Sequence, residues 1–211
     1  MDKVFGLYVI LTEPDLGYEK VAEAAVLENV RMLQLRMKKR PPGEVEKTAR
    51  ALRKITAGSQ TLFIVNDFVA IAAAVDADGV HLGQEDDSLA RARAAWPVPG
   101  KIFGFSTHGE EQERAARALA PDYIGVGPVY TTPTKEKPDP TLGLARMGAI
   151  VRFSPLVTVA IGGIDAENLP LVMAQGVKNF AVVRAVNRTD APRKAIGRLM
   201  QVWRQELEKN A

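Results

Sequence analysis

The sequence predicts an α/β fold, a compact (β/α)8 TIM barrel formed by a single domain over residues 1–211. Eight short apolar runs rich in β-branched residues alternate with segments of helical spacing, which is the order of βαβ units. Val and Ile follow one another in these runs without alternating polar residues, which is typical of parallel strands buried on both faces. No linker divides the chain.

The predicted strands are short and end in polar or charged residues. They cover Phe5–Leu11, Arg31–Leu35, Thr61–Val65, Gly79–Leu82, Lys101–Phe105, Tyr123–Val126, Leu156–Ile161 and Asn179–Val183. The predicted helices carry apolar residues at intervals of three and four or are rich in alanine. They cover Tyr18–Asn29, Glu44–Ile55, Ser88–Trp96, Gln112–Leu119, Ala166–Gln175 and Ala191–Lys209.

An open, doubly wound sheet is the alternative architecture. Such a sheet usually has about five or six strands and a glycine-rich fingerprint after the first one. The first run here is followed by Thr12-Glu13-Pro14, without those glycines, so the closed barrel is favoured.

Composition excludes several classes of protein. The 211 residues are 46% hydrophobic and 25% charged, which is ordinary for a globular protein, and they include no cysteine for a disulfide or a nucleophile. The 28 basic and 25 acidic residues give a net charge of +3 and are spread along the chain, which argues against nucleic-acid binding. No apolar stretch approaches the about 20 residues of a membrane span, and the first run lacks a signal-peptide cleavage site, so we expect a cytoplasmic protein without membrane association.

Two aspartates follow apolar runs. Asp67 comes directly after Ile64-Val65-Asn66, and Asp86 closes the run that begins at Val80. A carboxylate in this place is held at the rim of the sheet, and Mg²⁺ commonly takes one or two carboxylates together with substrate phosphates. The alternative is that both aspartates cap the helices that follow them. The other residues at the strand ends favour the metal site.

Basic and neutral polar residues follow the same set of strands. Gln34, Arg36 and Lys38 alternate along an extended segment, so their side chains point to one side of it. Because a barrel gathers functional groups at the carboxyl ends of its strands, we expect these three residues to share a pocket with Asn66, Ser106 and Lys135, where the cations would bind a diphosphate. The pair Gly162-Gly163 would expose backbone amides to a second phosphate.

Three further features have less specific sequence signals. His81 is expected to be a core histidine with satisfied hydrogen bonds, since buried polar groups normally find partners. His108 lies in a predicted loop, where it would either cap a helix or bind a ligand. The stretch Thr131–Pro140 is long and lacks apolar periodicity, which indicates an active-site lid.

Taken together, the motifs resemble those of the thiamine phosphate synthase (thiamine-phosphate pyrophosphorylase) family. The matching segments follow the family's order and cover nearly the whole chain: Gln34–Lys38, Val65–Asp67, His81–Asp86, Gly104–His108, Gly127–Tyr130, Thr132–Lys135, Gly143-Leu144 and Ala160–Ile164. The resemblance implies a compact barrel and a transferase of thiamine biosynthesis. Such an enzyme joins 4-amino-2-methyl-5-hydroxymethylpyrimidine diphosphate to a thiazole phosphate, releases thiamine phosphate and pyrophosphate, and uses Mg²⁺ as cofactor.

The resemblance also implies roles for individual residues. Those matching the pyrimidine diphosphate site are Gln34, Leu35, Arg36, Met37, Lys38, Asn66, Ser106 and Lys135, and the catalytic ones among them are Arg36, Lys38, Ser106 and Lys135. Those matching the Mg²⁺ ligands are Asp67 and Asp86. Those matching the thiazole phosphate site are Thr132, Pro133, Thr134, Gly163, Val183 and Arg184.

One position departs from the family's pattern. Where many members read Val-Ser-Ala-Ile after the eighth strand, this chain reads Val183-Arg184-Ala185-Val186. The guanidinium of Arg184 can bind a phosphate through two parallel hydrogen bonds, or it can point away and leave only backbone amides at the site.

Two other functions on the same barrel are the alternatives. A thiazole tautomerase would use His108 as its acid and base, but it has no need of the Asn66-Asp67 and Asp86 set. A non-catalytic barrel would only bind a phosphorylated metabolite. The expected partners are small-molecule substrates, with no nucleic acid and no membrane, and the assembly considered is a homodimer.

Overall fold

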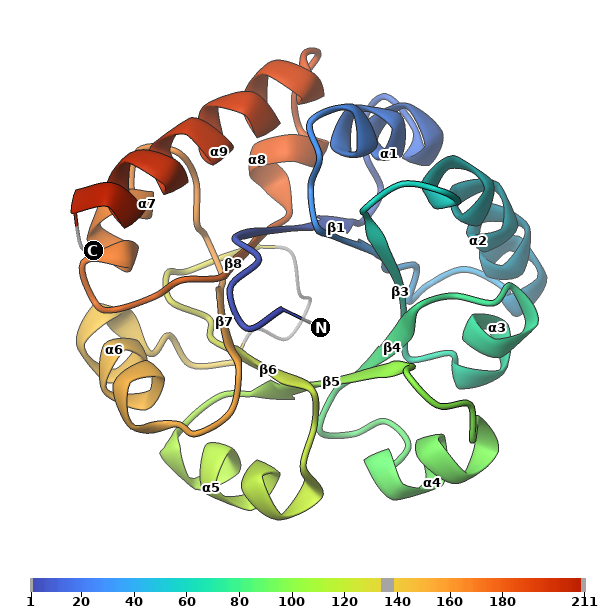
Figure 1. The fold of residues 1–211 in the computed structure, drawn as a ribbon, viewed down its shortest axis with the longest axis horizontal. Helices are drawn as coiled ribbons and strands as arrows, with labels where there is room; N and C mark the ends of the chain where they lie inside the picture. The colour runs from blue at the N-terminus through green and yellow to red at the C-terminus, as the bar shows by residue number, and fades with distance from the viewer. Residues whose placement is uncertain (1, 134–138, 210–211) are drawn as a thin grey trace.

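The computed structural model describes residues 2–133 and 139–209. Its strands form a closed parallel barrel, in which each strand pairs with the next and β8 pairs with β1 (Figure 1). The strands are β1 (Leu7–Leu11), β2 (Met32–Leu35), β3 (Leu62–Asn66), β4 (Gly79–Leu82), β5 (Ile102–Thr107), β6 (Tyr123–Val126), β7 (Thr158–Ile161) and β8 (Phe180–Val182). The predicted barrel is therefore confirmed, and every predicted strand is present to within two residues at each end.

Helices follow the strands and surround the barrel (Figure 1). They are α1 (Tyr18–Leu27), α2 (Pro42–Thr56), α3 (Val69–Ala74), α4 (Leu89–Ala95), α5 (Glu110–Leu119), α6 (Gly143–Phe153), α7 (Leu169–Met173), α8 (Arg184–Asn187) and α9 (Pro192–Lys209). The six predicted helices are confirmed in place, although α7 is shorter than predicted. The ranges of α3, α6 and α8 were not predicted. Among the helices of the described residues, none has both the length and the apolar character needed to cross a membrane.

Alternate residues of each strand face either the barrel interior or the helices. The interior is filled by a compact apolar cluster of Phe5, Tyr8, Ile10, Met32, Ile64, Ile102, Tyr123, Val159 and Ala181. The residues between them, such as Leu7, Val9 and Leu11, pack with the helices in a larger outer core. Because both faces of every strand are buried, the strands can be apolar throughout, which explains their continuous Val and Ile runs.

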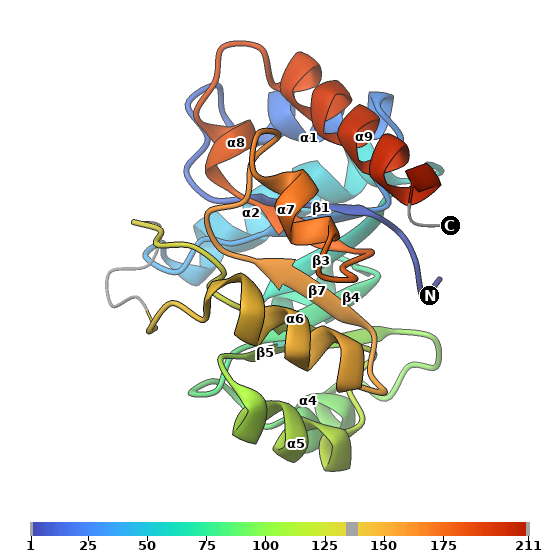
Figure 2. The ribbon, with the colours of Figure 1, turned by 90° about the vertical axis from the view of Figure 1, so that its left-hand side faces the viewer.

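All the strands run in the same direction, so their carboxyl ends gather at one rim of the barrel and their amino ends at the other. We call these the carboxyl rim and the amino rim. In the side view, the N-terminal segment and the end of α9 lie on the right, whereas the described residues that follow β6 project on the left, at the carboxyl rim (Figure 2).

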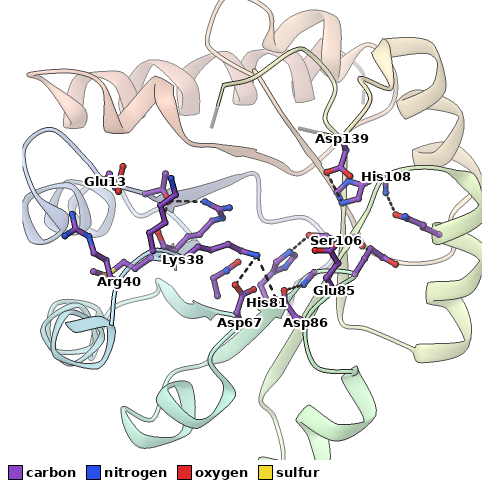
Figure 3. Close-up of a pocket in the computed structure, with 18 of the residues that line it drawn as sticks. Glu13, Lys38, Arg40, Asp67, His81, Glu85, Asp86, Ser106, His108 and Asp139 are labelled. Carbon is purple, nitrogen blue, oxygen red and sulfur yellow. Dashed lines mark hydrogen bonds and ion pairs between the residues drawn. The ribbon is translucent and has the colours of Figure 1, made fainter. Parts of the chain in front are cut away.

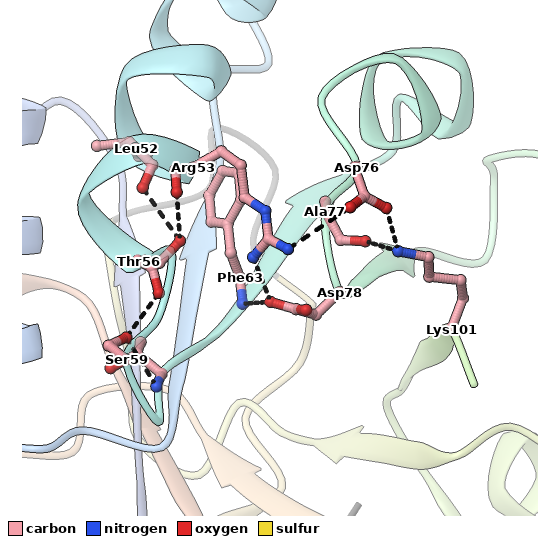
Figure 4. Close-up of polar contacts among 10 residues, drawn as sticks. Leu52, Arg53, Thr56, Ser59, Phe63, Asp76, Ala77, Asp78 and Lys101 are labelled. Atoms are coloured by element: carbon pink, nitrogen blue, oxygen red, sulfur yellow. Dashed lines mark hydrogen bonds and ion pairs between the residues drawn. The ribbon is translucent and has the colours of Figure 1, made fainter.

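The amino rim carries paired charges. Oδ2 of Asp78, which precedes β4, accepts hydrogen bonds from the backbone N–H of Phe63 at 2.7 Å and from Nη1 of Arg53 at 3.1 Å. Next to it, Oδ1 of Asp76 lies 2.6 Å from Nζ of Lys101 (Figure 4). Each carboxylate therefore has a donor. Asp78 connects α2 and β3 to the start of β4, and Asp76 connects the segment before β4 to the start of β5.

Candidate active site

A pocket of about 830 Å³ opens at the carboxyl rim (Figure 3). Its walls come from the loops after β1 to β5 and from residues 139–140, so segments distant in sequence meet there. The predicted site residues that line it are Arg36, Met37, Lys38, Asn66, Asp67, Asp86 and Ser106. The polar ends of β2 to β5 therefore converge as the sequence predicts.

Asp67 and Asp86 face each other across the pocket floor, with Lys38 above them (Figure 3). Nζ of Lys38 lies 3.2 Å from Oδ2 of Asp67 and 4.0 Å from Oδ1 of Asp86. The backbone of Asp67 has φ 63°, in the left-handed region, and its N–H donates to the carbonyl of His81 at 2.9 Å. Asp is one of the few residues that tolerate this conformation, which turns the chain at the end of β3.

Neither aspartate caps a helix. The N-cap of α3 is Phe68, without a side-chain hydrogen bond, and the N-cap of α4 is Ser88, whose hydroxyl accepts from the backbone N–H of Arg91. Instead, Oδ2 of Asp86 accepts from the backbone N–H of Gly83 at 2.7 Å, which holds the β4–α4 loop. The capping alternative for Asp67 and Asp86 is therefore wrong.

The two carboxylates perturb each other. Burial, together with the hydrogen bond and the charge of Asp86, raises the pKa of Asp67 to about 6, although Lys38 opposes this. Burial also acts to raise the pKa of Asp86, but the hydrogen bonds with Asp67 and Gly83 and the charge of Lys38 outweigh it and lower the pKa. Like charges this close cannot both ionise freely without a compensating cation.

The donor chemistry of this pair fits Mg²⁺. Among the residues the structure describes, no group of three or more His, Asp or Glu side chains could hold a metal ion. A cation between Asp67 and Asp86 would therefore take only two protein carboxylates and complete its shell with water and phosphate oxygens, which is the usual arrangement for Mg²⁺.

Asn66 supplies a second sign of a ligand site. Its side chain lines the pocket and is 6% exposed, and Nδ2 has no hydrogen-bond partner within the described part of the chain. A buried donor without an acceptor is unfavourable, so such atoms are usually satisfied by a ligand or by water.

Arg36 continues the line of β2 into the pocket. Its backbone N–H donates to the carbonyl of Leu11, and its Nη1 lies 3.4 Å from the hydroxyl of Thr12. Burial lowers the pKa of Arg36, while the charges of Asp67 and Asp86 act to raise it. A guanidinium remains charged under these conditions, so Arg36 brings a partly desolvated cation to the pocket.

Two of the predicted residues lie beneath the pocket instead of lining it. Gln34 is 1% exposed, and its Nε2 donates to the hydroxyl of Tyr8 at 2.7 Å in the barrel interior. The side chain of Leu35 packs in the outer core and is not among the described pocket-lining residues. Successive side chains of a strand point to opposite faces, so Gln34 and Arg36 point to the inner side of the barrel and Leu35 points toward the helices.

His81 has the satisfied ring that the sequence predicts, but it is half-buried and not a core residue. Its ring nitrogens are satisfied, since Nδ1 lies 3.0 Å from the hydroxyl of Tyr123 and Nε2 lies 2.9 Å from Oγ of Ser106. It also lines the pocket. The prediction of a satisfied histidine is confirmed, but its contact with Ser106 depends on the register of β4 and β5, which the sequence does not state.

His108 approaches the stretch that was predicted to be a lid. Nδ1 of His108 donates to the carbonyl of Gly127 at 2.7 Å, and Nε2 lies 3.4 Å from Oδ2 of Asp139. Asp139 and Pro140 line the pocket. Thr134 and Lys135 lie outside the described residues.

Of the residues predicted for the thiazole phosphate, Thr132 and Pro133 follow β6 and Gly163 follows β7, at the same rim. Gly163 follows β7 with φ 67°, and a Cβ there would lie 2.8 Å from Cβ of Tyr130 and 3.2 Å from the carbonyl of Thr131. The backbone leading to Thr132 and Pro133 therefore packs directly against the end of β7. None of Thr132, Pro133 and Gly163 is among the described residues that line the pocket.

The end of β8 completes this side of the rim. Val183 is half-buried, and Arg184 is exposed and begins α8. Neither is among the described pocket-lining residues.

Sequence reasoning missed several residues of the pocket wall. They are Thr12, Glu13, Tyr18, Lys39, Arg40, Gly83, Gln84, Glu85 and Gln112. Of these, Gln84 stands in a noticeable motif, but Glu13 lies in the loop after β1 and Tyr18 begins α1, without a distinctive pattern.

Comparison with known proteins identifies the family. A model of the thiamine monophosphate synthase family matches residues 7–186. The chain belongs to this family. The thiamine-phosphate synthase of Archaeoglobus fulgidus is 36% identical over 196 residues, which are 92% of this chain and 91% of that protein. The family predicted from the sequence is therefore confirmed.

Two further relatives of the thiamine monophosphate synthase family differ in how much of each protein is matched. The thiamine phosphate pyrophosphorylase structure from Pyrococcus furiosus has a TM-score of 0.87 and 32% identity, and the match covers 96% of this chain and 97% of that one. The thiamine-phosphate synthase of Synechocystis sp. is 43% identical over 194 residues, or 92% of this chain. The chain spans about half the length of that relative, 56%.

Proposed function

We propose that this chain is a thiamine phosphate synthase. It joins 4-amino-2-methyl-5-hydroxymethylpyrimidine diphosphate to 4-methyl-5-(2-phosphoethyl)thiazole and releases pyrophosphate. The observation that carries the proposal is the meeting of the Asp67–Asp86 pair with Lys38 and Arg36 in one pocket of a barrel of this family. A carboxylate pair beside two cations suits a substrate whose diphosphate bridges a metal ion and basic side chains.

The pyrimidine diphosphate is the substrate of this pocket. Arg36 and Lys38 bind its phosphate oxygens, and the unpartnered Nδ2 of Asn66 donates to an acceptor on the substrate. Asp67 and Asp86 would hold the magnesium ion. When bound, Mg²⁺ supplies Lewis-acid stabilisation of the negative charge on the leaving diphosphate.

The reaction needs no protein nucleophile. The bond between the substrate methylene and the diphosphate oxygen breaks, and its electron pair leaves with pyrophosphate. The aminopyrimidine delocalises the positive charge left on the methylene carbon, to which the thiazole nitrogen then donates its lone pair. Arg36 and Lys38 stabilise the charge that builds on pyrophosphate, and Lys135 is proposed to join them.

The thiazole phosphate is proposed to bind at the adjoining part of the carboxyl rim. The residues assigned to it are Thr132, Pro133, Thr134, Gly163, Val183 and Arg184. The close packing of Gly163 against the Thr131 backbone supports a shared site for the ends of β6 and β7. The stretch 131–140 is proposed to exclude water, which would otherwise capture the cationic intermediate.

An assay of the purified chain with both substrates and Mg²⁺ tests the proposal. We expect pyrophosphate and thiamine phosphate in equal amounts, and neither when one substrate is left out. Conversion of the thiazole phosphate alone, without pyrophosphate, would indicate the tautomerase alternative with His108 as its acid and base. Substrate binding without turnover would indicate a metabolite-binding barrel.

A matched pair of lysine variants links the activity to this pocket. Lys38→Met removes a cation that lies 3.2 Å from Asp67, whereas Lys101→Met removes one that lies 2.6 Å from Asp76 at the opposite rim. We expect Lys38→Met to lower kcat/KM by about two orders of magnitude, and Lys101→Met to leave it within a factor of about two. Equal losses in the two variants would contradict the assignment of the pocket.

A further inference from the structure

Five side chains form a hydrogen-bonded line from the barrel interior to the pocket. Nε2 of Gln34 donates to the hydroxyl of Tyr8 at 2.7 Å, and the hydroxyls of Tyr8 and Tyr123 are 2.8 Å apart. The hydroxyl of Tyr123 lies 3.0 Å from Nδ1 of His81, and Nε2 of His81 lies 2.9 Å from Oγ of Ser106. Ser106 and His81 line the pocket, so the line ends at the proposed substrate site (Figure 3).

Packing fixes the middle of this line. The side chains of Tyr8 and Tyr123 are 1% and 0% exposed, and their rings meet edge to face with centroids 5.8 Å apart. The ring of His81 stacks on Tyr123 at 5.5 Å. Gly104 leaves the space that Tyr123 occupies, because a Cβ at position 104 would lie 2.2 Å from Cζ of that ring. The groups therefore have little freedom to exchange partners.

The chemistry of each group sets the direction of the hydrogen bonds. The amide nitrogen of Gln34 only donates, so the hydroxyl of Tyr8 accepts there and gives its hydrogen to Tyr123. A buried hydroxyl hydrogen needs an acceptor, so that of Tyr123 is assigned to Nδ1 of His81, whose role in this contact depends on its tautomer. A neutral imidazole that accepts at Nδ1 carries its own hydrogen on Nε2, which donates to Oγ of Ser106. The hydroxyl hydrogen of Ser106 is thereby directed to an acceptor in the pocket.

We propose that Tyr8, Tyr123 and His81 are positioning residues that hold the Ser106 hydroxyl as a hydrogen-bond donor to the pyrimidine diphosphate. His81 performs this role as the neutral tautomer with its hydrogen on Nε2, and Gln34 sets the tautomer from the far end of the line. The identity of the acceptor rests on the proposed function, but the tautomer and the direction of the line do not.

Nitrogen NMR of the histidine rings tests the tautomer directly. The chain has only two histidines, so the signals of ¹⁵N-histidine protein are assigned with one His108→Asn variant. We expect a pyrrole-type shift for Nε2 of His81 and a pyridine-type shift for Nδ1. A hydrogen on Nδ1, alone or together with one on Nε2, overturns the proposal.

Tyr123→Phe tests the line itself, because it removes the group that donates to Nδ1 of His81. We expect the His81 ring to divide between its two neutral tautomers, which would bring the shifts of its two nitrogens together. Unchanged wild-type shifts in a folded Tyr123→Phe variant overturn the proposal.

Kinetics of the double variant Tyr123→Phe/Ser106→Ala test whether the hydrogen-bonded line acts through Ser106. We expect Tyr123→Phe to lower kcat about three- to tenfold, the effect of one hydrogen bond, and to lower it little further in a Ser106→Ala background. Effects that multiply in the double variant overturn the proposal. The KM for the thiazole phosphate should not change.

Thr61→Val is the matched control for the loss of a buried hydroxyl. Oγ1 of Thr61 donates to the carbonyl of Val30 at 2.7 Å, far from the pocket. We expect this variant to lose thermal stability and to keep its kcat. An equal loss of kcat in Thr61→Val overturns the proposal. The NMR measurements need no turnover, so a wild-type chain that makes no thiamine phosphate would refute the proposed function and leave this test intact.

Discussion

The two rims of the barrel use the same polar residue types in opposite ways. At the amino rim, Oδ2 of Asp122 accepts from the backbone N–H of Phe103 at 2.8 Å, and Oδ1 of Asn179 accepts from those of Phe5 and Gly6 at 2.7 and 3.1 Å. Each polar oxygen has a donor there. At the carboxyl rim, carboxylates face each other and a buried amide donor has no described partner.

The difference shows that polar side chains stabilise the fold at the amino rim, whereas those at the carboxyl rim are arranged to bind a ligand. At the amino rim, side-chain hydrogen bonds fasten each of three strand starts to a neighbouring strand. At the carboxyl rim, the proximity of Asp67 and Asp86 costs free energy that Lys38 offsets only in part, since the pKa of Asp67 stays raised. Native proteins tolerate such conflicts mainly at functional sites, which agrees with placing stability at one end of a barrel and chemistry at the other.

Asp67→Asn should have the largest effect on activity. The substitution keeps the shape of the side chain but removes one of the two proposed Mg²⁺ ligands, so we expect the single-turnover rate to fall by about two orders of magnitude or more. Stability should stay the same or rise, because the contact between like charges is relieved. Rapid-quench assays and urea unfolding measure the two effects.

Isothermal titration calorimetry sharpens this comparison. In the presence of pyrophosphate, we expect Mg²⁺ binding to weaken strongly in Asp67→Asn. The control is Asp78→Asn at the amino rim, where the carboxylate accepts hydrogen bonds from Phe63 and Arg53. We expect this variant to bind Mg²⁺ with the affinity of the wild type. Wild-type affinity in Asp67→Asn would remove Asp67 from the metal site.

Asn179→Ala should have the largest effect on stability. Asn179 is 3% exposed, and its amide joins the N-terminal segment to β7 and β8 by accepting from Phe5 and Gly6 and donating to the carbonyls of Lys3 and Thr158. Truncation leaves buried backbone groups unpaired, so we expect a loss of about 2 kcal/mol in the free energy of unfolding. Urea unfolding measures it, and the kcat of the folded fraction should not change.

Local sequence was sufficient to predict the strands and several of the residues that line the pocket. Continuous apolar runs mark buried strands directly, and the alternation of Arg36 and Lys38 fixes their common side without knowledge of the neighbours. The metal-site prediction at Asp67 likewise depends only on its place directly after a strand. Each of these features depends only on a few consecutive residues, so it can be predicted without knowledge of the tertiary structure.

Features that depend on register could not be predicted. The line from Gln34 to Ser106 joins side chains of β2, β1, β6, β4 and β5, and no single segment indicates that Tyr123 meets His81. Asp78 precedes its strand as an ordinary turn residue would, and only the pairing of β3 with β4 makes it a partner of Phe63. The helix α3 was missed because Val69–Ala74 is apolar throughout and has no helical period.

Glu113→Gln should show a smaller, pH-dependent effect at a contact between α5 and the end of α6. The buried carboxylate accepts from Arg117 at 2.8 and 2.9 Å and from Ser154 at 2.6 Å. Burial acts to raise the pKa of Glu113, but these hydrogen bonds outweigh it and lower the pKa below its ordinary value of 4.5. The ionised form is therefore favoured by folding, and its contribution is present above the unfolded pKa.

We expect Glu113→Gln to lose about 1 kcal/mol in the free energy of unfolding at pH 7. The difference from wild type should shrink as the pH falls from about 4.5 through the lower pKa of the folded state, because the wild-type carboxylate then becomes protonated. Urea unfolding across this pH range measures the difference. A difference that grows on acidification would mean that the contact favours the protonated acid.

Asp76→Ala should have the smallest effect, although its hydrogen bond to Lys101 is only 2.6 Å long. The Asp76 side chain is 78% exposed, so water screens its 2.6 Å contact with Lys101 and its 3.8 Å contact with Arg53. We expect a change below about 0.5 kcal/mol in the free energy of unfolding, against a larger loss for Asp78→Ala, whose carboxylate also holds the backbone N–H of the buried Phe63. Equal losses in the two variants would mean that exposed ion pairs, and not the bonds to strand amides, stabilise this rim.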